Sequence, residues 1–130
     1  MILWESDNED FFTVNSVASN LVQLENELTE TIAKIIELGI FNNDYVEFYS
    51  DATNGSFFIN ELNHNKERID ESKTVHFCAL KIWEDYNDSN EFDSNMKTAL
   101  NHSLKKLASE NIRIPFKIIL RDEGGDEIEI

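Results

Sequence analysis

Apolar residues recur every three or four positions between Ser16 and Leu38. This spacing draws a single stripe along a helix, and it predicts an amphipathic helix over the segment. Asn15 or Ser16 can cap its first turn, while Gly39 can end it in the left-handed conformation, with Ile40 making the accompanying hydrophobic contact. The predicted stripe is Val17, Leu21, Leu24, Leu28, Ile32, Ile35 and Leu38, and the predicted outer face is Gln23, Glu27, Glu30, Lys34 and Glu37.

Two β-prone runs follow this helix, Tyr45–Ser50 and Ser56–Leu62. The dipeptide Asn54-Gly55 between them can hold positive φ, so the two runs are predicted to pair as a β-hairpin. The polar stretch 63–73 has neither helical nor strand periodicity, and we expect it to be an exposed connection.

The most apolar run of the chain is Thr74–Trp83, which is hydrophobic at both odd and even positions near its centre. Such a run is typical of a central strand that is covered on both faces. Cys78 is the only cysteine and lies inside this run. We therefore expect a buried, unreactive thiol rather than a disulfide partner or a nucleophile.

A second helix is predicted after the central strand. Asp88 can cap its N-terminus, with Glu91 three positions on as in a capping box. Asn111 can take the left-handed conformation that ends the helix. The predicted buried stripe is Phe92, Met96, Leu100, Leu104 and Leu107.

The two ends of the chain also carry strand patterns. Alternating apolar residues predict a strand over Ile114–Arg121, with Pro115 marking an edge or the beginning of that strand. The turn residues Glu123–Asp126 allow 127–130 to fold back as a short edge strand, which we favour over a free tail. Two further β-prone segments are Met1–Trp4 and Phe11–Val14.

Taken in order, these elements predict an α+β fold with a mostly antiparallel sheet packed by two helices. The element order is β-α-β-β-β-α-β, to which the short C-terminal edge strand can be added. The chain of 130 residues shows no repeat and no linker rich in proline or glycine, so residues 1–130 are expected to form a single domain.

The charge narrows the classes of partner. The chain has 26 acidic and 11 basic residues, a formal net charge of -15 at pH 7. The negative electrostatic field of such a chain repels nucleic acid and anionic membranes, and it accelerates association with cationic partners. The acidity can equally be explained as a means of keeping the protein soluble. The sequence shows no run long enough to cross a membrane and no signal-peptide pattern, so a cytoplasmic protein is expected.

Known catalytic and metal-binding spacings are missing from the sequence. His64, His76 and His102 fall in three different elements, with no spacing that suggests zinc. His76 and Cys78 stand two residues apart, about 6 to 7 Å along a strand, which is too far for a direct hydrogen bond in regular geometry. The glycine pair Gly124-Gly125 is flanked by carboxylates that would repel phosphate. We therefore expect neither enzyme activity nor a cofactor.

The segment Asp85–Asp93 places oxygen-bearing side chains at alternate positions, as a calcium loop does. However, Asn90 stands where the loop needs glycine, and Met96 where it needs glutamate. A helix cap with carboxylates in the first turn explains the pattern more simply, so no metal site is expected.

Acidic clusters at 5–10, 84–93 and 122–129 adjoin aromatic residues. Carboxylates that steer a partner, beside aromatic rings that anchor it, are typical of a surface that grips a basic protein. Aromatic core residues next to solvated loops would look the same. The aromatic residues are Trp4, Phe11, Trp83, Tyr86 and Phe92, and the predicted partner-binding residues are Trp83, Glu84, Asp85, Tyr86, Asp88, Glu91 and Asp93.

In size, acidity and element order, and without a diagnostic motif, the chain resembles the immunity proteins of bacterial polymorphic-toxin systems, including contact-dependent growth inhibition. The resemblance implies a protein-binding inhibitor that neutralises a cognate basic toxin nuclease by covering its active site or its nucleic-acid surface. The alternative is an acidic regulatory or adaptor domain that acts through protein contacts or dimerisation. A small hydrolase with paired carboxylates is a third class.

Overall fold

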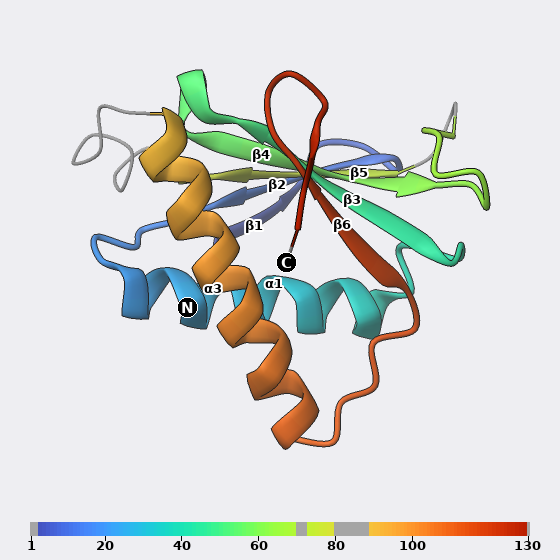
Figure 1. Ribbon diagram of the computed structural model, residues 1–130. Helices are drawn as coiled ribbons and strands as arrows, with labels where there is room; N and C mark the ends of the chain where they lie inside the picture. The colour runs from blue at the N-terminus through green and yellow to red at the C-terminus, as the bar shows by residue number, and fades with distance from the viewer. Residues whose placement is uncertain (1–2, 70–72, 80–88, 130) are drawn as a thin grey trace.

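The computed structural model describes residues 3–69, 73–79 and 89–129. Within them, seven strands form one sheet, and two α-helices pack against one of its faces (Figure 1). The α+β class with two helices on a mostly antiparallel sheet is confirmed. The elements are β1 (Leu3–Ser6), β2 (Phe11–Asn15), α1 (Leu21–Leu38), β3 (Tyr45–Asp51), β4 (Ser56–Leu62), β5 (Thr74–Cys78), α3 (Ser89–Ser109), β6 (Lys117–Arg121) and β7 (Glu127–Ile128), with a short 3-10 turn, η1 (Ala52–Asn54), between β3 and β4.

The strand order across the sheet is β1-β2-β5-β4-β3-β6-β7. Four of the six pairings are antiparallel, and the pairings of β2 with β5 and of β3 with β6 are parallel. Parallel neighbours need a long crossover, and α1 and α3 lie in the segments between such strands. The predicted hairpin of β3 with β4 and the predicted edge strand β7 are both confirmed.

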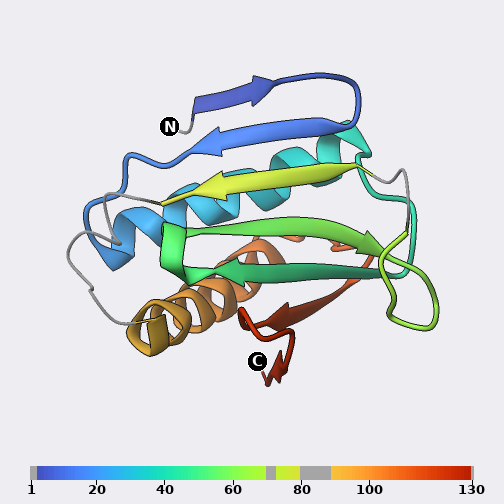
Figure 2. The same ribbon diagram turned by 90° about the horizontal axis from the view of Figure 1, so that it is seen from above.

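The core lies between the helices and one face of the sheet, while the other face is uncovered by either helix (Figure 2). We call this second face the open face. Residues in β5 alternate between buried and half-buried, with Val75 and Phe77 in the core and His76 on the open face. The expectation that Thr74–Trp83 is covered on both faces is therefore wrong for the strand that the structure describes within this run, Thr74–Cys78, because both helices pack on the same side.

The first helix begins at Leu21, five residues later than the sequence pattern suggested. Asn20 is its cap, accepting a hydrogen bond from the backbone of Gln23 at 2.9 Å. The segment before it is held by Glu27, whose carboxylate accepts from the Ser16 hydroxyl and from the backbone of Val17. Glu27 is consequently buried and Val17 is exposed, the reverse of the predicted stripe.

The ends of both helices follow the sequence signals. Gly39 has φ 62 and is the left-handed cap of α1, with Ile40 buried beside it. Asn111 has φ 61 after α3. The predicted α3 stripe is buried at Phe92, Met96, Leu100 and Leu107, with Leu104 packed partly against the core.

The strand β6 begins at Lys117, three residues after the predicted start. Its first cross-strand bond joins the Lys117 amide to the Asp44 carbonyl at 2.7 Å. Pro115 carries no amide hydrogen to donate to a ladder, and the Phe116 ring turns inward to an edge-on contact with Phe41.

Candidate functional site

Five of the seven predicted partner-binding residues lie outside the described residues: Trp83, Glu84, Asp85, Tyr86 and Asp88. The other two, Glu91 and Asp93, stand at the beginning of α3, where Glu91 is exposed and Asp93 is half-buried. Phe92 between them is wholly buried in the core. Phe92 therefore stabilises the fold, as its place in the predicted buried stripe implies, and it is not one of the aromatic residues available at the surface.

Asp93 shows that two of the acidic clusters lie close together. Its Oδ1 accepts a hydrogen bond from the Ser50 hydroxyl at 2.5 Å. Burial raises the pKa of Asp93, and the negative charges of Asp122 and Glu123 raise it further against the lowering effect of Ser50. The turn between β6 and β7 thus lies within electrostatic range of the beginning of α3.

This acidic turn is bound to the hairpin of β3 and β4. The Glu123 carboxylate accepts from the Thr53 backbone at 2.5 Å, and its carbonyl accepts from the Tyr49 hydroxyl at 2.6 Å. Within the turn, the Asp122 amide donates to the Asp126 carbonyl at 2.9 Å. One end of the sheet therefore holds carboxylates from three segments, which we call the acidic end: Asp51, Glu91, Asp93, Asp122, Glu123 and Asp126.

The third acidic cluster, 5–10, is at the opposite end of the sheet. The strand register shows this, because it pairs Asp51 with Ser56, Ser56 with Cys78 and Cys78 with Asn15, so the acidic end lies beside the Asn15 end of β2. The turn from β1 to β2 adjoins the other end of β2, at Phe11. The three sequence clusters accordingly form two separate acidic regions.

The pair His76 and Cys78 requires a correction. The Cys78 Sγ lies 3.5 Å from His76 Nδ1, because both side chains project from the open face and the imidazole bridges the backbone spacing. Cys78 is half-buried there rather than enclosed in the core. Burial raises the pKa of the Cys78 thiol and lowers the pKa of His76, although Asp51 and Asp7 oppose the second effect. Both shifts favour the neutral thiol and the neutral imidazole, so the contact does not generate a thiolate nucleophile.

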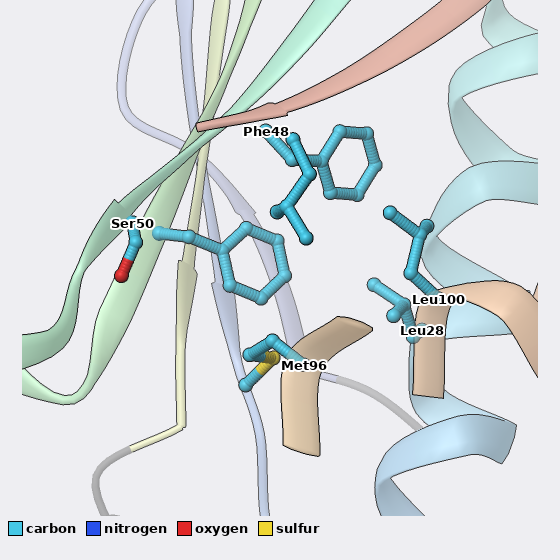
Figure 3. A pocket seen from close by; sticks show the side chains of 7 residues that line it. Leu28, Phe48, Ser50, Met96 and Leu100 are labelled. Carbon is cyan, nitrogen blue, oxygen red and sulfur yellow. The ribbon is translucent and has the colours of Figure 1, made fainter. Parts of the chain in front are cut away.

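A gap in the core between the sheet and the helices is lined by Phe48, Met96 and Leu100, among others (Figure 3). Its volume is about 10 Å³. A single water needs about 10–15 Å³ and several polar partners. Ser50 is its one polar lining residue, and that hydroxyl is already bonded to Asp93. The gap is a packing defect and not a ligand site.

Sequence reasoning missed a charged cluster on the open face. Glu47 has no exposed surface, and its carboxylate contacts Arg68 Nε and Arg121 Nη1. The Asn60 amide donates to the same carboxylate at 3.0 Å. Arg68 comes from the polar stretch 63–73, whose described part, 63–69 and 73, is mostly exposed as predicted. The alternation of residues along β3 could have predicted which face of the sheet Glu47 lies on. No sequence pattern predicted its contacts with Arg68 and Arg121, which are far away along the chain.

Comparisons with protein-family models, curated proteins and solved structures found no match to this chain. Across the described ranges, no three side chains of histidine, cysteine, aspartate or glutamate are grouped so as to hold a metal ion. Neither α1 nor α3, the two described helices, is long and apolar enough to cross a membrane.

Proposed function

We propose that this protein is an acidic inhibitor that binds a cognate basic toxin nuclease and covers its active site or nucleic-acid-binding surface. The observation that supports the proposal is the acidic end, where carboxylates from α3, from the β6–β7 turn and from the end of β3 share one region. The net charge of -15 adds a long-range field of the same sign.

The chemistry of a nuclease explains why such a region would inhibit it. A nuclease must present cationic groups to the phosphates of its substrate, and those groups attract any dense array of carboxylates. An acidic protein can thus occupy the groups that bind phosphate and exclude the nucleic acid. The fixed turn at Glu123 favours this role, because carboxylates held by the fold lose little conformational entropy on binding.

The partner is first captured on the immobilised native chain from a lysate of the source organism and eluted with salt. The purified partner is then tested for nuclease activity with and without a stoichiometric amount of the protein. We expect a basic nuclease whose activity falls when the protein is added. Capture of only further copies of the chain would instead favour the regulatory or dimerising alternative.

The binding surface is tested by charge reversal at Glu91 and Asp126 of the acidic end, together with Asp85, a predicted partner-binding residue that lies outside the described residues. Asp88 is spared as the predicted helix cap, and Asp93 because it is bonded to Ser50. We expect association at low salt to slow by roughly tenfold or more, since steering falls with local charge. The rate is measured by surface plasmon resonance at two salt concentrations.

The matched control carries the same change of charge at the opposite end of the sheet, at Glu5, Glu9 and Asp10. All three are exposed. At about 0.1 M salt we expect its association rate to fall by at most about threefold and by less than that of the acidic-end variant, because charges beyond the Debye length of about 10 Å at that ionic strength are screened. Equal slowing in both variants would contradict the assignment of the acidic end as the binding surface.

A further inference from the structure

The open face contains a hollow of about 390 Å³ on the side of the sheet away from the helices. Ligand pockets generally range from about 300 to 1,000 Å³, so this space is large enough for one small molecule. Its lining combines three aromatic rings with one guanidinium and two small polar side chains. The lining residues are Phe11, Tyr49, Phe58, Asn60, Arg68 and Thr74.

Planar side chains stand in line beside this hollow. The register places His76, Phe58 and Tyr49 next to one another on three adjacent strands. The rings of Phe58 and His76 are stacked, with centroids 4.3 Å apart and planes 7° from parallel. The guanidinium of Arg68 lies over the Tyr49 ring, 4.5 Å from its centroid. Two of the rings that line the hollow, Phe58 and Tyr49, are therefore already ordered by contacts with their neighbours.

Arg68 is held in place by its contact with Glu47. Its Nε contacts that carboxylate, and among the described residues neither of its Nη atoms has a hydrogen-bond partner. By comparison, both Nη atoms of Arg121 have partners, with Nη1 donating to Glu47 at 2.5 Å and Nη2 donating to the Lys66 carbonyl at 3.0 Å. One carboxylate against two guanidiniums leaves this group of three with a net charge of +1.

The sign of this group is opposite to the net charge of the chain, which is -15. Burying a carboxylate among charged partners adds little stability compared with an apolar replacement, because desolvation offsets the attraction. Arginine is, however, suited to binding carboxylate or phosphate through paired Nη donors while its plane stacks on an aromatic ring. The side chain of Arg68 is 55% exposed, so those donors are within reach of a ligand.

We propose that the hollow binds a small planar aromatic anion, with its ring against Phe58 and Phe11 and its carboxylate or phosphate on the Nη atoms of Arg68. The acidic surroundings favour a ligand with one or two negative charges over a polyanion such as a nucleic acid. This site is distinct from the acidic end and does not depend on the toxin-inhibitor function.

The experiment is a titration of the isotope-labelled full chain, followed by amide chemical shifts in NMR spectra. Indole-3-carboxylate and adenosine monophosphate are the two anionic probes, and they distinguish a carboxylate from a phosphate ligand. Indole-3-carboxamide tests the need for charge, and cyclohexanecarboxylate tests the need for a flat ring. We expect saturable shifts at Phe58, His76 and Arg68 with at least one anionic probe, and binding at least tenfold weaker for both controls.

Two variants are matched on the same face of the sheet. Arg68→Gln should weaken binding of the anionic probe by about tenfold, the size expected for one charge-assisted contact. Lys117→Gln removes an exposed positive charge of β6 that does not line the hollow, and it should change the affinity by less than about twofold. Phe58→Leu, which removes a ring and keeps every charge, provides a second variant should Arg68→Gln fail to fold.

The proposal is overturned if neither anionic probe shifts these amides at about 10 mM, a concentration that would reveal a dissociation constant in the millimolar range. It is also overturned if the carboxamide binds as tightly as the carboxylate, or if binding survives unchanged in both Arg68→Gln and Phe58→Leu. Binding of one anionic probe and not the other supports the site and identifies the charged group that it prefers.

Discussion

Three glutamates that hydropathy assigns to water are buried in this protein: Glu27, Glu47 and Glu61. Each carboxylate has specific partners, as burial of a charge requires. Glu61 accepts from the backbone amides of Asn42 at 2.5 Å and Asn43 at 2.8 Å, which orders the loop before β3. Glu27 orders the loop before α1 in a similar way. At the residue scale, acidic side chains thus shape the connections as well as the surface.

Asp93 differs from these three glutamates because its environment disfavours its charge. Burial and neighbouring carboxylates raise its folded pKa above the ordinary value of 3.8. The folded state therefore binds more protons than the unfolded state just above that pH, and stability falls as the pH rises through this window. Above the raised pKa of Asp93, the loss of folding stability no longer changes with pH.

Asp93→Asn should remove this loss while keeping an oxygen that accepts from Ser50. We expect the variant to be more stable than the native chain at pH 7 by less than about 1 kcal/mol, because Asp93 is half-exposed and water screens its charge. The difference should vanish below pH 3.8. Urea unfolding at a series of pH values measures it, and a native chain that is the more stable one at pH 7 would contradict the prediction.

At the scale of elements, the C-terminal end of α1 is set by a local sequence signal, whereas the segment before its N-terminus is held by longer-range contacts. Its C-terminus ends at Gly39 as the sequence indicates, with the Ile40 amide reaching back to the Ile35 carbonyl at 3.2 Å. Its N-terminus is instead capped by Asn20, and the loop before it is held by the bond between Ser16 and Glu27. The caps proposed from sequence, Asn15 and Ser16, were wrong because Asn15 is the last residue of β2, paired with Cys78, and the Ser16 hydroxyl donates to Glu27.

Gly39→Ala should destabilise the protein by about 1 kcal/mol, since φ 62 is disfavoured for a residue with a Cβ atom. A Cβ atom there would meet no other atom within 4 Å, so crowding does not contribute. Gly39→Asn is the matched variant and should lose less stability, because asparagine tolerates this conformation. Thermal unfolding followed by circular dichroism compares the two, and equal losses would argue against a conformational cause.

At the scale of the whole molecule, charge is distributed unevenly over a sheet that is covered on one face only. Acidic side chains gather at the end of β3 and in the turn between β1 and β2, while Arg68 and Arg121 lie on the open face. The excess of like charge also opposes the compact state. The pairs at Glu47 are protected from salt because that carboxylate is buried.

Raising sodium chloride from about 20 mM to about 500 mM should therefore stabilise the protein, by about 1 kcal/mol or roughly 4 °C in Tm. A variant with Glu5→Gln, Glu9→Gln and Asp10→Asn should show a smaller increase in Tm, because it has less charge repulsion for salt to screen. Differential scanning calorimetry provides the comparison. A Tm that stays constant or falls with salt would show that attractive pairs outweigh the net repulsion.

For both candidate sites, the sequence could not predict which distant residues come together. The acidic clusters were visible in the sequence, but the proximity of 122–127 to the beginning of α3 depends on the parallel pairing of β3 with β6, which no local pattern specifies. The cluster at Glu47 joins residues 21 and 74 positions apart along the chain. Polar side chains from distant segments become partners only after the strands are ordered.

The sequence by itself determined the α+β class, the hairpin of β3 and β4, the short edge strand β7 and the left-handed ends of α1 and α3. These features follow from periodicity and from residues with special backbone preferences, which act over a few positions. Only the tertiary structure decided which face of β5 is open and which carboxylates are buried. Those outcomes depend on both helices packing on one side of the sheet, a choice made by contacts between segments far apart in the chain.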